Sequence, residues 1–463
     1  MSHLIRRRDL LAAAVLPVAA RAQPPPRDLI VDRRTISINN RAASVYRVGT
    51  TDGASGIVLN PGERFRVRVR NRLNEPTILH WHGQTPSANQ DGVAGQGSTE
   101  ALIAPQGERD YDFVARPGTH WMHSHHGLQE QRLLAAPLIV RDAGTAGQDV
   151  QDVVMLLHDF SWRDPKDILA GLGGGGHAGH GMPMMGSRMG GMDLNDIVFD
   201  EFLANDRTLA DPQVVPVERG VQVRLRVINA ASATQFWLDL GALDATILAT
   251  DGNPIIPTNA PAATPIAIGQ RLDFGFRMPS SGVFPIMAQV EGTTKRTGIL
   301  LATPGAAITT SFTQAGPQAM PPADLSIERR LVAQTPLAER AEDLRHKITL
   351  GGNMMRYQWT IDNQLWPDRR PLPVRLGQRV VLEMINNTPM SHPMHLHGHH
   401  FQVVEINGAK LNGPIRDTVL VPAGGKIAVA FDADNPGKWL LHCHNLYHMT
   451  AGMMTELAYA GTS

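Results

Sequence analysis

The chain of 463 residues contains one cysteine, Cys443, so no disulfide within the chain can stabilise its fold. It also lacks a charge imbalance, with 43 basic and 43 acidic residues, which argues against nucleic acid or an anionic membrane as a partner. Beyond the N-terminus we find no apolar run long enough to span a bilayer. The length predicts about three globular domains and leaves open whether they form a monomer or a homo-oligomer.

The first 22 residues are typical of an export signal and are excluded from the predicted fold. A basic stretch at residues 6–8 precedes Leu10, Leu11 and a short alanine-rich run, and small residues near Ala22 suit cleavage. The Arg-Arg-x-Leu-Leu pattern resembles a twin-arginine signal, and an ordinary secretory signal with extra arginines is the alternative. We therefore expect a periplasmic protein, exported by the twin-arginine route.

A strand-forming unit is repeated along the chain. Runs in which polar and apolar residues alternate predict half-buried strands. One unit leads from a glycine through such a strand to an asparagine, and it occurs at residues 62–71, 220–229 and 377–386. The glycines are 158 and 157 residues apart (220 − 62 and 377 − 220). This spacing predicts an all-β chain of three consecutive Greek-key β-sandwich domains.

Composition places the domain boundaries between these units. We predict a first domain at 23–143, a second at 144–303, a linker rich in proline, alanine and glycine at 304–324, and a third domain at 325–463. Within the second domain, residues 171–192 are of low complexity and rich in glycine, methionine and histidine. That composition predicts a loop.

Histidine is abundant, with 19 copies, and the informative ones fall in four clusters. The clusters are His80-Trp81-His82, His123-Ser124-His125, His392-Pro393-Met394-His395-Leu396-His397 and His442-Cys443-His444. On a strand, His-x-His places both imidazoles on one face, which suits ligands of neighbouring metal ions. In the last cluster the cysteine points to the opposite face, so one tripeptide serves two metal sites.

The clusters follow the repeat. His80 and His395 lie 18 residues after the repeat glycine (80 − 62 and 395 − 377), where the middle copy has Leu238. The second and fourth clusters likewise begin five residues after Gly118 and Gly437. We infer that the first and third domains each give four histidines to a metal cluster between them, and that the middle domain is free of metal.

A second site follows from an unusual set of donors, namely His392, Cys443, His448 and Met453. Imidazole alone suits zinc, copper, iron and nickel alike. Two imidazoles and a thiolate in one plane, with a weak axial thioether, describe a blue-copper electron-transfer site. The sequence therefore predicts copper.

These motifs closely resemble those of the multicopper oxidases, the family of laccases and copper-efflux oxidases, over nearly the whole chain after the signal. The resemblance implies three cupredoxin-like domains and four copper ions. It assigns type 1 copper to His392, Cys443 and His448 with axial Met453, type 2 copper to His80 and His395, one type 3 ion to His82, His123 and His444, and the other type 3 ion to His125, His397 and His442.

The resemblance also implies the reaction. A small reducing substrate gives up electrons singly near the type 1 copper, and the electrons pass through Cys443 to His442 and His444. Dioxygen is then reduced to water.

Protons for that reaction require acids. Asp91 matches a family carboxylate that orients water or relays protons, and an Asp-Gly turn is the alternative reading. Where the family often has a second acid, this chain has Met449 and Thr450. Asp417 resembles a family segment near the type 1 site, and we expect it to have a structural role.

Methionines bear on the substrate, because soft thioether sulfur selects Cu(I). The candidate extra ligands for Cu(I) are Met182, Met184, Met185, Met189, Met192 and Met390. Met390 matches a cuprous-ion ligand of copper-efflux oxidases, but Thr388 stands where an acid is expected. The methionine-rich segment of those enzymes typically lies nearer the third domain, and an inert insertion is the alternative here.

We therefore predict an oxidase that acts on Cu(I), phenols and aromatic amines and serves copper tolerance. One alternative is a laccase-type enzyme for organic substrates only. Another is a non-enzymatic periplasmic copper-binding protein. Dioxygen and a small reducing substrate are the expected partners.

Overall fold

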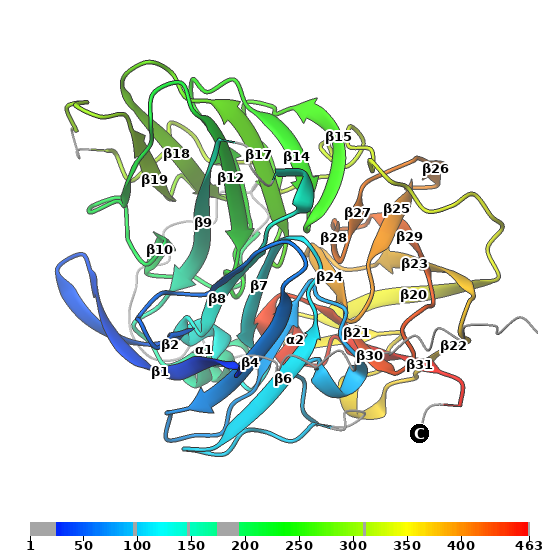
Figure 1. Cartoon of the computed structure of the whole chain (residues 1–463). Helices are drawn as coiled ribbons and strands as arrows, with labels where there is room; N and C mark the ends of the chain where they lie inside the picture. Colours follow the sequence, from blue (N-terminus) through cyan, green and yellow to red (C-terminus); the bar gives the residue numbers. More distant parts are fainter. Residues whose placement is uncertain (1–24, 96–99, 146–148, 174–193, 309–311, 462–463) are drawn as a thin grey trace, which may run out of the picture.

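The computed structural model describes residues 25–95, 100–145, 149–173, 194–308 and 312–461. Its strands form six sheets that pair into three β-sandwiches, which are the blue-to-cyan, green and yellow-to-red parts of Figure 1. The prediction of an all-β chain with three consecutive sandwiches is therefore confirmed. The predicted signal at 1–22 lies outside the described residues, as does the low-complexity segment from residue 174 onward.

The first sandwich consists of β1 (Arg27–Ile38), β2 (Arg41–Thr50), β3 (Ile57–Leu59), β4 (Arg64–Asn71), β5 (Leu79–His82), β6 (Glu108–Val114), β7 (Gly118–Ser124) and β8 (Ala135–Val140). Its two sheets have the strand orders β2-β1-β4-β6 and β3-β8-β7-β5. Three short 3-10 helices accompany it, η1 (Ala88–Gln90), η2 (Glu130–Arg132) and η3 (Ala143–Thr145).

The second sandwich consists of β9 (Val150–Phe160), β10 (Glu201–Ala204), β11 (Val214–Pro216), β12 (Gln222–Asn229), β13 (Phe236–Asp239), β14 (Thr246–Thr250), β15 (Asn253–Asn259), β16 (Thr264–Ile266), β17 (Arg271–Arg277), β18 (Val283–Val290) and β19 (Arg296–Ala302). Its sheets have the orders β10-β9-β12-β17-β14-β15 and β11-β19-β18-β13-β16. Helix α1 (Pro165–Gly173) follows β9.

The third sandwich consists of β20 (Leu344–Asn353), β21 (Gln358–Ile361), β22 (Leu372–Val374), β23 (Arg379–Asn386), β24 (His392–Leu396), β25 (Phe401–Ile406), β26 (Ala409–Lys410), β27 (Ile415–Arg416), β28 (Thr418–Val421), β29 (Lys426–Asp432), β30 (Lys438–Cys443) and β31 (Met454–Tyr459). Its sheets have the orders β21-β20-β23-β29-β25-β26, with β27 beside β25, and β22-β31-β30-β24-β28. Helices η4 (Trp366–Asp368) and α2 (Leu446–Thr450) complete it. Among the described residues, no helix is long and apolar enough to cross a membrane.

The repeat has a physical cause at each end. The opening glycine has a positive φ, a conformation that favours glycine, with values of 74° at Gly62, 67° at Gly220 and 83° at Gly377. The closing asparagines are buried, and they are Asn71, Asn229 and Asn386. Each amide donates to two or three backbone carbonyls, and each side-chain oxygen accepts from the N–H two residues on. The asparagine therefore fixes the loop that leads into the next strand.

That next strand carries the first histidines of each cluster. In the first domain β5 pairs with β7, so that His80 lies opposite His123. In the third domain β24 pairs with β30, so that His395 lies opposite His442. In the middle domain β13 pairs with β18 in the same way, but Leu238 lies opposite an alanine. One backbone arrangement thus holds imidazoles in two domains and apolar side chains in the third.

Candidate metal centre

A site of three donor atoms lies on one face of β30. Cys443 ends this strand, His392 begins the neighbouring strand β24, and His448 lies on α2. The Cys443 Sγ atom is 3.7 Å from Nδ1 of His392 and 3.7 Å from Nδ1 of His448, and the two Nδ1 atoms are 3.1 Å apart. All three side chains are buried. A thiol and two imidazoles that converge in this way fit the donor set of blue copper.

The backbone around this site is tied together. The Asn445 side chain caps α2 by accepting from the N–H groups of Tyr447 and His448. The N–H of Cys443 donates to the carbonyl of Met453 at 3.1 Å, and the N–H of Met453 donates to the carbonyl of His448 at 3.0 Å. Met453 is fully buried. The predicted axial residue is therefore held between the segments that carry two of the ligands.

Each imidazole of the site is oriented from its outer edge. Nε2 of His392 lies 2.7 Å from the hydroxyl of Thr388, and Nε2 of His448 lies 3.1 Å from Oδ2 of Asp196. The phenol of Tyr357 also donates to Asp196. A His448 ring that donates its Nε2–H to a carboxylate keeps the lone pair of Nδ1 for a metal ion.

Asp196 remains charged despite its burial. Burial raises the pKa of this carboxyl, but hydrogen bonds from His448 and Tyr357 outweigh that effect and hold the pKa below its usual value. The indole ring of Trp359 covers the same region, with its centroid 4.2 Å from that of the His448 ring. The Cys443 site therefore has one negative charge at its edge and an aromatic wall beside it.

A second site lies on the opposite face of β30, between the first and third domains. Eight histidines form it, and they are His80, His82, His123, His125, His395, His397, His442 and His444. The rings of His82 and His395 stack with centroids 3.8 Å apart, although they come from different domains. Sets of three, such as His125 with His397 and His442, bring their ring nitrogens within 4.8 Å of one another.

Unpaired nitrogen atoms show what this site can hold. The buried ring nitrogens without a hydrogen-bond partner are Nε2 of His80, His123, His125, His395 and His444, and Nδ1 of His82 and His444. Nε2 of His397 and Nε2 of His442 face each other at 2.9 Å. Buried polar atoms without partners are costly, and metal ions would supply the missing partners. The residues therefore fit a group of metal ions.

The rings are kept in the form that binds metal. Burial, with smaller contributions from neighbouring rings and cations, lowers the pKa well below its usual value in His82, His123, His125, His392, His395, His397 and His444. Burial lowers the pKa of His442 to about 4. Neutral imidazoles coordinate metal, whereas protonated ones do not.

Two predicted acids lie against the outer edges of these rings. Oδ2 of Asp91 is 2.8 Å from Nδ1 of His397, and the carbonyl of Asp91 is 2.8 Å from Nδ1 of His80. Asp417 was expected near the type 1 site, but it lies at the histidine cluster, with Oδ1 3.0 Å from Nε2 of His82. The Arg271 guanidinium donates to Asp417 and holds its pKa below the usual range despite burial, which acts in the opposite direction.

The structure brings His392, Cys443 and His448 together, and it gathers the eight histidines predicted for the type 2 and type 3 ions at the second site. Met390 lies four residues after Asn386, which donates to its carbonyl, and its side chain is buried. The predicted Cu(I) ligands Met182, Met184, Met185, Met189 and Met192 lie outside the described residues. Sequence reasoning missed Asp196, Tyr357, Trp359 and a buried acid, Glu130, because none belongs to a histidine motif or to the repeat.

Comparisons with known proteins agree with this geometry. Three family models, each described as multicopper oxidase, match residues 31–145, 152–310 and 340–462. The chain is 34% identical to multicopper oxidase MmcO of Mycobacterium tuberculosis, over 92% of this chain and 85% of that protein. It is 26% identical to copper resistance protein A of Escherichia coli, over 96% and 94% of the two chains. The structure of a laccase from Botrytis aclada matches with a TM-score of 0.75 at 25% identity, over 94% of this chain and 88% of that one.

Proposed function

Because the chain belongs to the multicopper oxidase family, it is an oxidoreductase that reduces dioxygen, and we propose that its two sites hold four copper ions. His392, Cys443 and His448, with Met453, hold the type 1 ion, and the eight-histidine cluster holds the type 2 ion and the type 3 pair. Copper in these sites supplies one-electron oxidation of a substrate and reduction of dioxygen to water.

One observation carries this proposal. Strand β30 presents the thiol of Cys443 to one site and the imidazole of His442 to the other, and His444 follows directly. Covalent bonds alone therefore connect the two sites, and no solvent gap separates them. A strand that alternates faces with a period of two gives this connection directly.

Asp91 is the residue that we propose to move protons at the histidine cluster. Its Oδ2 is engaged by His397, whereas its buried Oδ1 has no hydrogen-bond partner and lies 3.4 Å from Nδ1 of His80. A carboxylate oxygen in that position is able to accept a proton and release it.

Oxidation of Cu(I) is the first candidate activity. Met354 and Met355 are exposed, by 40% and 84%, in the turn that leads to Tyr357. Tyr357 donates to Asp196, which in turn contacts His448, so two exposed, soft thioethers precede closely in the sequence a residue linked to the Cys443 site. Met192 also precedes Asp196 by four residues in the sequence (196 − 192). The similarity to a copper resistance protein supports a role in copper tolerance.

Oxidation of phenols and aromatic amines is the second candidate activity. It is supported by the relatives that are named laccases. We further propose a periplasmic location reached by the twin-arginine route, on the strength of the arginine pattern at residues 6–8.

Oxygen uptake by the copper-loaded chain separates these activities. Three proteins are compared with Cu(I) and with a phenol as electron donor: the parent, a variant lacking residues 174–192, and the double variant Met354→Leu, Met355→Leu. A role for the methionines predicts that Cu(I)-dependent uptake falls while phenol-dependent uptake holds. Unchanged Cu(I) oxidation in both variants would leave organic substrates as the function.

A further inference from the structure

Glu130 is a buried acid that the copper ligands do not explain. It opens η2, five residues after His125 (130 − 125), and its side chain is only 3% exposed. One of its oxygens, Oε1, has no hydrogen-bond partner. Burial of a carboxylate is costly unless nearby charge or hydrogen bonds compensate, so this position requires an explanation.

The Glu130 carboxylate faces two imidazoles that belong to different domains. Its Oε2 lies 3.0 Å from Nδ1 of His123 on β7, a nitrogen that also lies 3.1 Å from the carbonyl of Ser124. Its Oε1 lies 3.9 Å from Nδ1 of His444, which follows β30. The opposite nitrogen, Nε2, is unpaired in both rings. Glu130 therefore lies on the Nδ1 side of both rings, and the Nε2 atom of each ring is available to a metal ion.

Glu130 also completes a pattern around the cluster. Asp417 lies behind His82 in the same way, and His82, His123 and His444 are the three rings assigned to one type 3 ion. With Glu130 included, each of these three rings has a carboxylate oxygen within 4.0 Å of one of its nitrogens, although Nδ1 of His444, 3.9 Å from Oε1, is beyond hydrogen-bond distance. Hydrogen bonding of this kind fixes the tautomer and the orientation of a metal-binding imidazole and raises its basicity.

The turn that carries Glu130 is braced from both sides. Gln129 accepts hydrogen bonds from the hydroxyls of Thr77 and Ser124, each at 2.8 Å, and donates to a backbone carbonyl. Gln131 accepts a hydrogen bond from Ser232 of the second domain. The carboxylate is therefore held in a fixed place.

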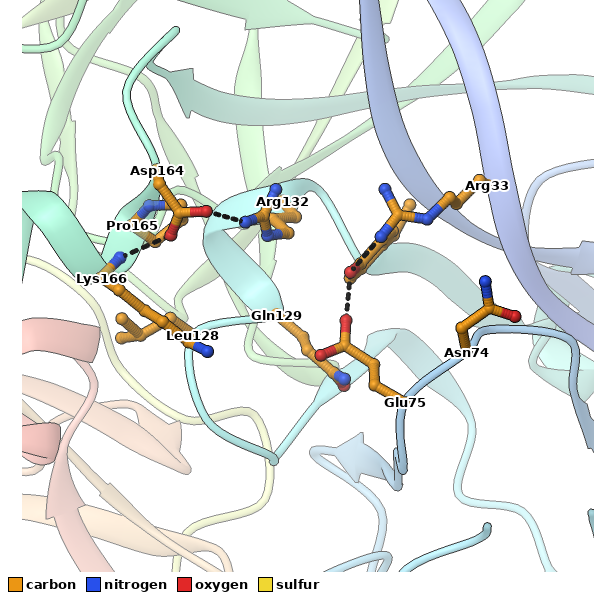
Figure 2. A pocket seen from close by; sticks show the side chains of 10 residues that line it. Arg33, Asn74, Glu75, Leu128, Gln129, Arg132, Asp164, Pro165 and Lys166 are labelled. Carbon is orange, nitrogen blue, oxygen red and sulfur yellow. Dashed lines mark hydrogen bonds and ion pairs between the residues drawn. The ribbon is translucent and has the colours of Figure 1, made fainter. Parts of the chain in front are cut away.

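The outer side of the same turn faces a polar pocket of about 270 Å³. Figure 2 shows Gln129 and Arg132 in its wall, with Arg132 paired to Asp164. Glu75, also in the wall, accepts a hydrogen bond from the phenol of Tyr46. Glu130 is not among the residues that line this pocket. The turn thus separates the inward-facing Glu130 from outward-facing polar groups. Glu75 is a suitable control acid for Glu130, because it contacts no copper ligand in the described interactions.

We propose that Glu130 is a positioning residue of the histidine cluster, which holds His123 through its Nδ1 together with the carbonyl of Ser124, so that this ring directs Nε2 at a copper ion shared with His444. The inference rests on the proposed function, since it assumes that these two rings bind the same ion. Loss of such a partner typically weakens metal binding by about 10- to 100-fold.

The test compares Glu130→Ala and Glu130→Gln with Glu75→Gln in the full chain. Each protein is titrated at buffered free copper, and bound copper per chain, the blue absorption of the Cys443 site and the melting temperature with and without copper are measured. We expect Glu130→Ala to weaken copper binding at the histidine cluster by about 10- to 100-fold while the blue absorption persists. Glu130→Gln retains an acceptor oxygen and recovers part of the affinity, and Glu75→Gln matches the parent.

The copper-free proteins distinguish positioning from a purely structural role. Removal of a poorly satisfied buried acid is neutral or stabilising, so copper-free Glu130→Gln should melt at or above the parent temperature and gain less when copper is added. Unchanged copper affinity in Glu130→Ala overturns the proposal, as does an equal fall in melting temperature with and without copper. A parent chain that binds copper but does not consume dioxygen contradicts the proposed function, while the affinities still decide the role of Glu130.

Discussion

The two faces of β30 carry sites that are supported in different ways. On the Cys443 face, the three donors come from one domain, and their outer edges meet a hydroxyl and a single acid, Asp196. On the histidine face, the rings come from two domains and meet three carboxylates, those of Asp91, Asp417 and Glu130. The site within one domain is shaped mainly by its backbone, whereas the site assembled between domains also uses charged groups to hold several of its rings.

Cys443→Ser should have the largest effect, because it removes the residue that joins the two faces. We expect complete loss of blue absorption and of substrate-dependent oxygen uptake, while the histidine cluster still binds copper. Visible spectra, oxygen uptake and bound copper on one sample check this. Full oxygen uptake without the thiol would show that the faces are not joined through β30.

Asp91→Asn should affect the histidine face alone. The amide still accepts from His397 through its oxygen, but it neither carries charge nor relays a proton. Oxygen uptake should fall by about 10²- to 10⁴-fold, the usual contribution of a positioned proton donor or acceptor. Without dioxygen, a phenol should bleach the blue absorption at the parent rate, and slower bleaching would mean that the two faces are not independent.

Asp196→Asn should affect the Cys443 face alone. The amide keeps an acceptor for His448 and loses a negative charge, which otherwise favours the oxidised, more positive site. The reduction potential of the blue site should rise, because the free energy of reduction becomes more favourable by about 1–2 kcal/mol per electron, as expected for one charge near a partly buried group. A redox titration measures this, with Tyr357→Phe as a control that keeps the charge. An equal shift in the control would contradict the assignment to charge.

Asn445→Ala should have the smallest effect. It removes the cap of α2, which places His448, and such caps contribute about 1 kcal/mol to the free energy of unfolding. Chemical denaturation of the copper-free chain checks the value. Asn445→Ser restores a capping oxygen and should recover most of the stability. If Ser and Ala behave alike, the cap is not what positions the helix.

The fold was predictable because its signals are periodic. In each repeat copy the glycine adopts the positive φ of a left-handed turn, and the buried asparagine anchors the following loop by hydrogen bonds. The histidine strands follow from the same spacing. The sequence also showed that the middle copy has Leu238 in place of an imidazole.

The acids around the sites were harder to predict. Glu130 lies in the polar run Gln129-Glu130-Gln131-Arg132, which resembles an exposed turn, yet the glutamines bond inward and the acid is buried. Asp196 follows a low-complexity segment with no pattern to place it. Asp417 was expected near the Cys443 site from the family segment that it resembles, but its side chain meets His82 of the histidine cluster. Such contacts depend on how domains pack against one another.

The most direct test of the central claim is the electron balance of the copper-loaded parent chain. The measurement counts equivalents of substrate oxidised per dioxygen consumed and assays for hydrogen peroxide in the same reaction. A chain in which β30 joins both sites should use four electrons for each dioxygen and release no peroxide. Two electrons per dioxygen with accumulation of peroxide, or no uptake by fully loaded protein, would contradict the account.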